Sequence, residues 1–232
     1  MIVSHKHRFI FVKTRKVAGT SVELFLSPFC GEDDIVTPVS REDEPMRQGL
    51  GPRNYRLRGS GTGRLLRLVG EAVGRPAIGH GGFYNHMPAH EIRRLVGDEV
   101  WNGYYKFSIE RNPWDRQVSL YHWAYRNRSE KPSFEAFIRS PLQRRRSPNF
   151  DIYSIGGEVA VDKVCRYERL DEGLTEVART IGIADNVSLA KAKAGHRPRA
   201  SWRDYYTPET RDIVARWYAR EIEAFGYTFD GD

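Results

Sequence analysis

Two stretches of the chain share one pattern, in which a short apolar run is followed by a turn and then by apolar residues at helical spacing. In the first stretch the run occupies residues 9–12, and Val22, Phe25 and Leu26 follow at intervals of three and one. A short continuous run of β-branched and aromatic residues is typical of a strand that is buried on both faces. The pattern therefore predicts a strand, a loop and a helix between residues 9 and 26.

The second stretch repeats this arrangement between residues 104 and 125. An apolar-rich run ends at a turn that is marked by Asn112 and Pro113, and apolar residues then recur at intervals of three and four. The sequence thus predicts a second unit of strand, turn and helix.

Strands that alternate with helices predict an α/β fold with a central, mostly parallel sheet flanked by helices. We expect another strand at residues 159–167, a helix that ends at Gly182, and a last helix that Thr207 caps, that starts at Pro208 and that ends at Gly226. The 232 residues suit a single domain, residues 1–232. Ligands of such sheets bind beyond the carboxyl ends of the strands, where both turns would lie.

The loop before the first helix has the features of an anion-binding turn. Gly19 would allow the backbone to approach a ligand, and Thr20 and Ser21 can cap the helix, whose first N–H groups attract an anion. Lys16 adds a mobile positive charge. The usual P-loop places its lysine after the last glycine and before a magnesium-binding hydroxyl. Because Lys16 precedes Gly19, the loop is P-loop-like, but a metal-bridged phosphate is a less natural ligand.

Both turns resemble motifs of one family, the sulfotransferases that use 3′-phosphoadenosine 5′-phosphosulfate (PAPS). Residues 16–21 are similar to the Pro-Lys-x-x-Gly-Thr-Ser loop of the carbohydrate sulfotransferases, although Arg15 stands where proline is frequent. Residues 111–121 match the family's 3′-phosphate motif, Arg-Asn-Pro-x-Asp-Arg-x-x-Ser-x-Tyr. The resemblance implies that Arg111 and Ser119 bind the 3′-phosphate. It also implies that the 5′-phosphosulfate is bound by Lys16, Val17, Ala18, Gly19, Thr20 and Ser21.

Three histidines, at positions 80, 86 and 90, lie between the two motifs. Pro88 suits the first turn of a helix that would end at Gly97, so His86 is expected in a loop just before that helix. Histidine can take a proton from a hydroxyl near neutral pH. The resembling enzymes carry a histidine at this place, which favours His86 as the base and leaves His80 as the alternative. No carboxylate or cysteine stands at a recognisable ligand spacing, and no metal is expected.

The formal net charge of +7 makes a polyanionic partner plausible but does not choose among a nucleotide, a glycan, a nucleic acid and a membrane.

Glycine and arginine alternate at residues 41–76, where we expect a mobile surface arm, and basic loops are expected at residues 144–146 and 191–203. Cys30 and Cys165 are too few for a disulfide framework or a zinc module, which favours a reducing compartment, and Cys165 suits a core position. With neither a membrane-spanning stretch nor a signal peptide apparent, we expect a cytoplasmic protein. Golgi members of the resembling family usually carry a membrane anchor, so the resemblance implies a bacterial-type enzyme or an excised domain.

The sequence therefore predicts a PAPS-dependent sulfotransferase that moves a sulfuryl group to a hydroxyl of a glycan or glycolipid, without a metal and without a nucleic-acid partner. His86 would remove the hydroxyl proton, and Lys16 would balance charge as adenosine 3′,5′-bisphosphate departs. Two alternatives stay open. A P-loop kinase of a small molecule would need ATP and magnesium, and a non-catalytic module that binds polyanions would be weakened by salt.

Overall fold

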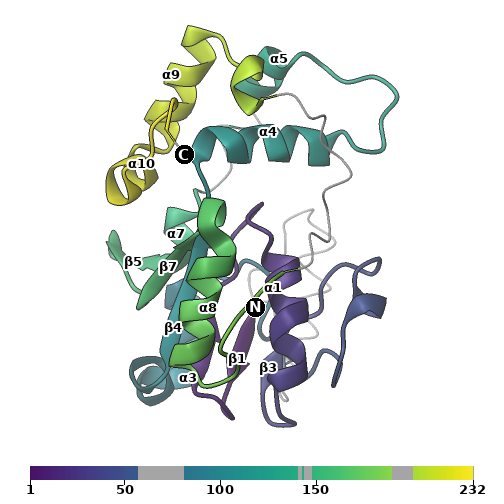
Figure 1. Ribbon diagram of the computed structural model, residues 1–232, viewed down its shortest axis with the longest axis vertical. Helices are drawn as coiled ribbons and strands as arrows, with labels where there is room; N and C mark the ends of the chain where they lie inside the picture. Colours follow the sequence, from purple (N-terminus) through teal and green to yellow (C-terminus); the bar gives the residue numbers. More distant parts are fainter. Residues whose placement is uncertain (57–80, 141–142, 144–147, 190–200, 232) are drawn as a thin grey trace.

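The computed structural model describes residues 1–56, 81–140, 143, 148–189 and 201–231. Among these residues, five strands form a central sheet in the order β3-β1-β2-β4-β7 (Figure 1). Strands β2, β4 and β7 are parallel, whereas β1 runs antiparallel to β2 and β3. The expected α/β fold with a mostly parallel sheet is therefore confirmed. The strands of the sheet are β1 (Ile2–Ser4), β2 (Phe9–Phe11), β3 (Ile35–Val36), β4 (Tyr105–Glu110) and β7 (Lys163–Arg166).

Helices follow or precede each of the parallel strands. The α-helices are α1 (Gly19–Leu26), α3 (Ala89–Gly103), α4 (Pro113–Ala124), α5 (Phe134–Arg139), α7 (Phe150–Tyr153), α8 (Leu170–Thr180), α9 (Pro208–Trp217) and α10 (Ala219–Phe225). Short 3₁₀ helices are η1 (Ser27–Phe29), η2 (Glu44–Met46), η3 (Tyr167–Arg169) and η4 (Trp202–Tyr205). Strands β5 (Ser154–Ile155) and β6 (Glu158–Val159) form a separate two-stranded sheet.

Both faces of the sheet are buried, as the apolar run of β2 predicts. Phe9 and Phe11 belong to a core cluster that includes residues of α1 and α8. Ile10 and Val12 belong to a second cluster with residues of α3 and α7. Because side chains alternate between the two sides of a strand, one continuous apolar run supplies both clusters.

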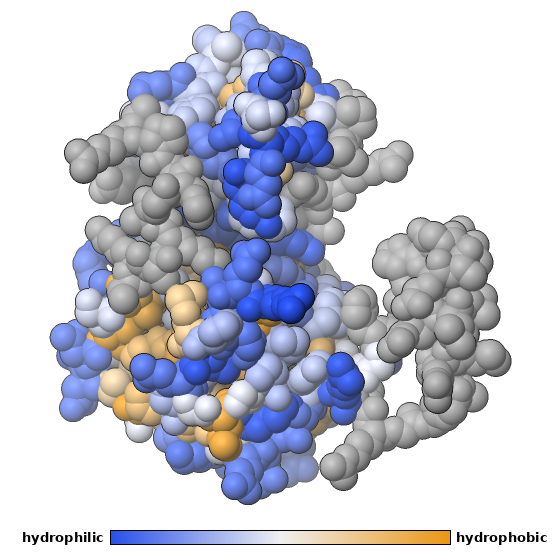
Figure 2. Space-filling view, turned by 90° about the vertical axis from the view of Figure 1, so that its right-hand side faces the viewer, coloured by the Kyte–Doolittle hydropathy of each residue, from blue (hydrophilic) through white to orange (hydrophobic). Residues whose placement is uncertain are grey.

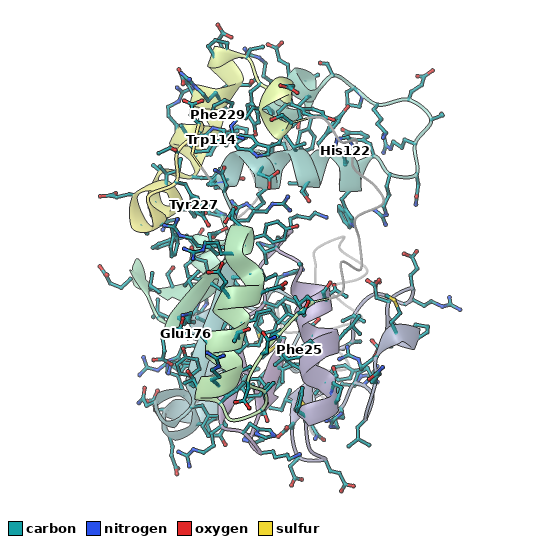
Figure 3. The ribbon with its side chains drawn as sticks, viewed as in Figure 1. Phe25, Trp114, His122, Glu176, Tyr227 and Phe229 are labelled. Carbon is teal, nitrogen blue, oxygen red and sulfur yellow. The ribbon has the colours of Figure 1, made fainter. Side chains whose placement is uncertain are left out.

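A third core cluster lies above the sheet, where α4 packs against α5, α9 and α10. At one end of α4 the Trp114 ring meets Phe229 edge-on at 5.7 Å between centroids, and at the other end His122 Nε2 lies 2.9 Å from the Tyr205 hydroxyl (Figure 3). On the face shown in Figure 2, apolar surface is concentrated on the half that contains the sheet. In the described parts of the chain, no helix is both long and apolar enough to cross a membrane.

Several element boundaries differ from the sequence predictions. The chain forms β1 before the expected first strand. Of the strand expected at residues 159–167, β7 contains residues 163–166 and β6 contains only Val159. Gly97 does leave the helical conformation, with φ 82° and ψ 161°, but helical structure resumes as far as Gly103. The last helix is interrupted at Tyr218, whose φ of −121° separates α9 from α10. The cap at Thr207 and the end at Gly226 are confirmed.

Residues 41–56 do not form the expected free arm. Arg53 makes a bridge with Val36 of β3, and both of the hydrogen bonds in that bridge are 3.0 Å long. The Arg47 guanidinium donates to the Thr37 carbonyl at 3.2 Å and pairs with Glu44. These arginines are therefore internal hydrogen-bond donors. The rest of the expected arm, residues 57–76, lies outside the described residues, as do residues 144–146 and 191–200 of the basic loops.

Candidate active site

The carboxyl ends of β2 and β4 lie side by side, because the two strands pair in parallel with Phe11 opposite Phe107. The Val12 N–H donates to the Phe107 carbonyl at 2.9 Å, and the Thr14 hydroxyl donates to the Ile109 carbonyl. These bonds continue the pairing of the strands into the loop that follows β2. The two sequence motifs are thus brought to the same edge of the sheet, the edge at which ligands of such folds bind.

The loop between β2 and α1 has an unusual backbone. Lys16 and Ala18 have φ angles of 63° and 61°, in the left-handed region that residues other than glycine rarely adopt. Helix α1 begins at Gly19 with Ala18 as its N-cap and no side-chain cap. The prediction that Thr20 and Ser21 cap the helix is wrong, because the helix begins earlier and both residues lie in its first turn. Their N–H groups have no acceptor within the helix, which suits an anion at its end.

Gly19 is required by a neighbour within the protein. A Cβ atom at this position would lie 2.9 Å from Cγ of Lys13, closer than two carbons can approach. The Lys13 side chain is buried and pairs with Glu23 of α1. Sequence reasoning missed this pair, which holds the Lys13 ammonium at Glu23 and leaves Lys16 as the basic residue of the matching motif.

Lys16, the first residue of the first motif, contacts residues of the second motif and of α4. Its carbonyl oxygen accepts a hydrogen bond from Arg111 Nη1 at 3.2 Å, and its ammonium lies 5.4 Å from the centroid of the Trp123 ring. Trp123 is near the end of α4 and is 47% exposed. The structure therefore brings Lys16 against both the start and the end of the helix that carries the second motif.

Arg111 is fixed at the junction of β4 and α4. It is 7% exposed, its Nε donates to Asp115 Oδ2 at 2.7 Å, and its guanidinium lies 4.0 Å from the centre of the Tyr167 ring. Helix α4 begins at Pro113, and the Asn112 side chain caps it by accepting from the Trp114 N–H at 3.1 Å. The predicted turn at Asn112 and Pro113 is thus confirmed. Ser119 is partly exposed and lies one turn beyond Asp115 along α4.

His86 lies in the loop before α3, as predicted, with φ 62°. Its Nδ1 is 3.2 Å from the carbonyl oxygen of Lys13. Because a carbonyl only accepts hydrogen bonds, Nδ1 carries the proton and Nε2 retains its lone pair. Burial, together with the positive charges of Lys13 and Arg15, lowers the pKa of His86 to about 4. The imidazole is therefore neutral at pH 7. His80 lies outside the described residues.

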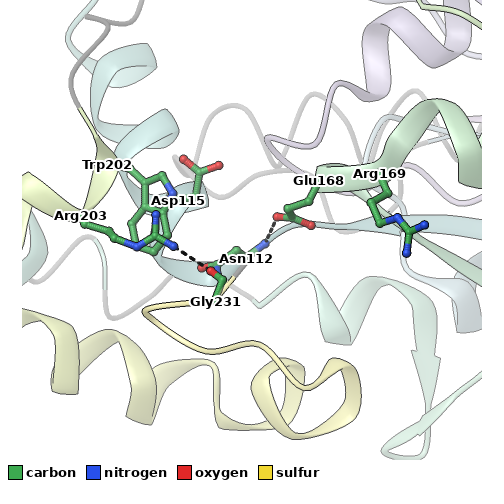
Figure 4. Close-up of a pocket in the computed structure, with 7 residues that line it drawn as sticks. All are labelled: Asn112, Asp115, Glu168, Arg169, Trp202, Arg203 and Gly231. Carbon is green, nitrogen blue, oxygen red and sulfur yellow. Dashed lines mark hydrogen bonds between the residues drawn. The ribbon is translucent and has the colours of Figure 1, made fainter.

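A cavity of about 270 Å³ adjoins the second motif on the side of η3 and η4 (Figure 4). Its lining includes Asp115, the partner of Arg111, together with Trp202 and Arg203 from the expected basic loop. The Asn112 N–H donates to Glu168 Oε1 at 2.7 Å within this lining. Sequence reasoning did not single out Glu168 or Trp202, because neither belongs to a motif with a fixed spacing.

Comparisons with known proteins agree with these motifs. The model of the sulfotransferase family matches residues 1–228. An uncharacterized protein of Archaeoglobus fulgidus is 32% identical over 106 residues, which are 44% of this chain and 88% of the relative. No solved structure gives a significant match. The match covers nearly the whole chain, and the protein belongs to the sulfotransferase family.

Proposed function

We propose that this protein transfers a sulfuryl group from PAPS to a hydroxyl of an acceptor, and that the acceptor is a carbohydrate such as a glycan or glycolipid. One observation carries the proposal. The 3.2 Å contact between Arg111 Nη1 and the Lys16 carbonyl joins the two segments that match the two phosphate-binding motifs of the family. The similarity of residues 16–21 to the loop of carbohydrate sulfotransferases supports a sugar hydroxyl as the acceptor.

The donor set of the site fits PAPS, which carries one anionic group at each end of its ribose. The first-turn N–H groups of α1 and the side chains of Lys16, Thr20 and Ser21 bind the 5′-phosphosulfate. Arg111 and Ser119 bind the 3′-phosphate. When bound, PAPS supplies the activated sulfuryl group, and this donor set calls for no metal.

His86 acts as the general base. Its Nδ1–H donates to the Lys13 carbonyl, which orients the ring and leaves Nε2 to take the proton of the acceptor hydroxyl. The neutral form that this role requires is the form favoured by burial. Assistance of this kind contributes about 10²-fold or more in rate.

Lys16 balances charge at the leaving oxygen. Its flexible side chain contacts Trp123, a surface residue, so the ammonium can leave that ring at small cost, about 0.5–1 kcal/mol for an exposed cation–π contact. A charged donor aimed at an oxygen that becomes negative contributes on the order of 3 kcal/mol to the transition state.

The deciding experiment is a calorimetric titration without metal, with adenosine 3′,5′-bisphosphate in one arm and ATP in the other. We expect the bisphosphate to bind more tightly, because ATP has no 3′-phosphate for Arg111 and Ser119. ATP binding that requires magnesium would indicate a kinase instead. Equal, salt-sensitive binding of both nucleotides and of sulfated glycans would indicate a module that binds polyanions.

A further inference from the structure

Asn149 contacts the loop of the first motif from a distant part of the chain. It lies just before α7 and is 2% exposed. Its Oδ1 accepts a hydrogen bond from the Arg15 N–H at 3.0 Å, and its Nδ2 donates to the Arg15 carbonyl at 3.0 Å. One side-chain amide thus pairs with both polar groups of a single residue, as a neighbouring strand would.

The same amide is anchored on the other side by Glu110, the last residue of β4. Nδ2 of Asn149 lies 3.3 Å from Glu110 Oε1. That oxygen also accepts from the Arg111 N–H at 3.0 Å and from Arg116 Nη1 at 2.8 Å. The Tyr153 hydroxyl donates to the second oxygen of Glu110 at 3.0 Å. With Glu110 fully buried and bonded on both oxygens, Asn149 rests on a rigid support.

The loop between β2 and α1 needs such support because its own sequence provides few stabilising interactions. Lys16 and Ala18 adopt left-handed backbone angles, and α1 has no side-chain cap. Residues in these conformations persist only where the surrounding structure imposes them. The Arg15 peptide groups, directly before Lys16, are the part of the loop that Asn149 fixes.

We propose that Asn149 is a positioning residue for the sulfuryl donor. It fixes the Arg15 backbone, and through it sets the place of Lys16 and of the first turn of α1 relative to Arg111. This inference rests on the proposed function, since it assigns the loop to the 5′ end of the nucleotide. It predicts that loss of the amide weakens the binding of a 5′-phosphate and spares that of a 3′-phosphate.

The test is calorimetry of Asn149→Ala with three ligands: adenosine 3′,5′-bisphosphate, adenosine 5′-phosphate and adenosine 3′-phosphate. We expect the two ligands with a 5′-phosphate to bind about tenfold more weakly, a loss comparable to the net contribution of about one buried hydrogen bond. Binding of adenosine 3′-phosphate should change less than about twofold. A partly unfolded protein would lose the same factor for all three ligands, and that result, or no loss at all, would overturn the inference.

Two further variants separate positioning from general stability. Gln117→Ala removes another buried amide, within the second motif, whose Nε2 donates to the Tyr218 hydroxyl at 2.5 Å, and it should not reproduce the selective loss for ligands with a 5′-phosphate. Asn149→Ala should weaken binding of the bisphosphate by a smaller factor when it is made in Lys16→Ala than when it is made in the wild type. The reason is that the two residues act through one loop, so their effects are not additive. Additive losses would contradict this.

If Asn149→Ala does not fold, Asn149→Ser takes its place, because a hydroxyl cannot bridge both polar groups of Arg15 and should give the same selective loss. Wild-type protein that fails to bind the bisphosphate would refute the proposed function itself. Wild-type protein that binds it, beside variants without selective loss, would refute only the role of Asn149.

Discussion

The turns after β2 and after β4 serve the same edge of the sheet but are built in opposite ways. The turn after β4 stabilises itself, since Asn112 caps α4, Pro113 occupies its first position and Asp115 pairs with Arg111. The loop after β2 has two residues in left-handed conformations and an uncapped helix, and its bonds come from β4, from Arg111 and from Asn149.

The difference indicates a division of roles. Arg111 is buried and bonded, as suits a group that binds a part of the substrate that does not react. Lys16 is in the externally supported loop, with its ammonium over a partly exposed ring, as suits a group that follows charge during the reaction. The comparison therefore predicts that the two basic residues affect different kinetic constants.

The largest effects should come from replacing these two residues. We expect Lys16→Ala to lower kcat about 10²- to 10³-fold, because in the proposed mechanism Lys16 is a donor that stabilises the transition state. Arg111→Ala should instead weaken binding of adenosine 3′,5′-bisphosphate by about 10- to 100-fold, since it removes a charged hydrogen bond worth about 1.5–3 kcal/mol. Initial-rate kinetics and calorimetry on both variants measure this division.

Arg126→Ala is the matched control, because Arg126 also lies over the Trp123 ring, at 4.7 Å, but is outside both motifs. Both kcat and the affinity for the nucleotide should stay within about twofold of the wild-type values, because substitutions of surface residues usually have small effects. Lys16→Ala with weakened binding and unchanged kcat would reverse the assigned roles.

The next effect is the pH dependence that His86 imposes. In the proposed mechanism the neutral form of His86 is the active one, and the pKa of His86 is lowered to about 4, mainly by burial. Activity measured as kcat/KM should therefore be lost as pH falls through about 4, because kcat/KM reports the free enzyme. A bound anionic donor would offset the charges of Lys13 and Arg15, so kcat should fall at a higher pH than kcat/KM.

His86→Ala should lower the rate about 10²-fold or more and remove this acid limb. The same pKa has a consequence for stability. An unfolded histidine titrates near 6.5, so the stabilisation of the neutral ring is complete above that value and is lost as pH falls toward 4. An acid limb that persists in His86→Ala would assign the base to another residue, with His80 the first to examine.

The smallest effects concern the two helix starts. Asn112→Ala removes a cap and should lower the free energy of unfolding by about 1 kcal/mol, which lowers Tm by about 2–4 °C at this size. Ala18→Gly relieves a left-handed residue, but it also makes the unfolded chain more flexible, so Tm should be unchanged or slightly higher. Thermal unfolding checks both. If Ala18→Gly lowers Tm by as much as Asn112→Ala does, α1 is stabilised by its own sequence.

The sequence allowed the two strand-turn-helix units to be predicted because apolar runs and helical spacing are local signals. The turn at Asn112 and Pro113 was visible for the same reason, whereas the role of Asn112 as the cap of α4 came from the structure. The backbone at Lys16 and Ala18 was not, because tertiary contacts impose it and no glycine marks either position. The Lys13–Glu23 pair and the bonds between Asn149 and Arg15, 134 positions apart, depend on folding that a single sequence does not display.

Glu110 limits which substitutions its neighbours can accept during evolution. Its carboxylate is a shared acceptor for Arg116, Asn149 and Tyr153, away from water. Replacing Glu110 alone removes one acceptor from all three of these groups, and breaking a buried ion pair such as Arg116–Glu110 commonly costs several kcal/mol. We therefore expect these four positions to covary among relatives, either retained as a set or exchanged as a set.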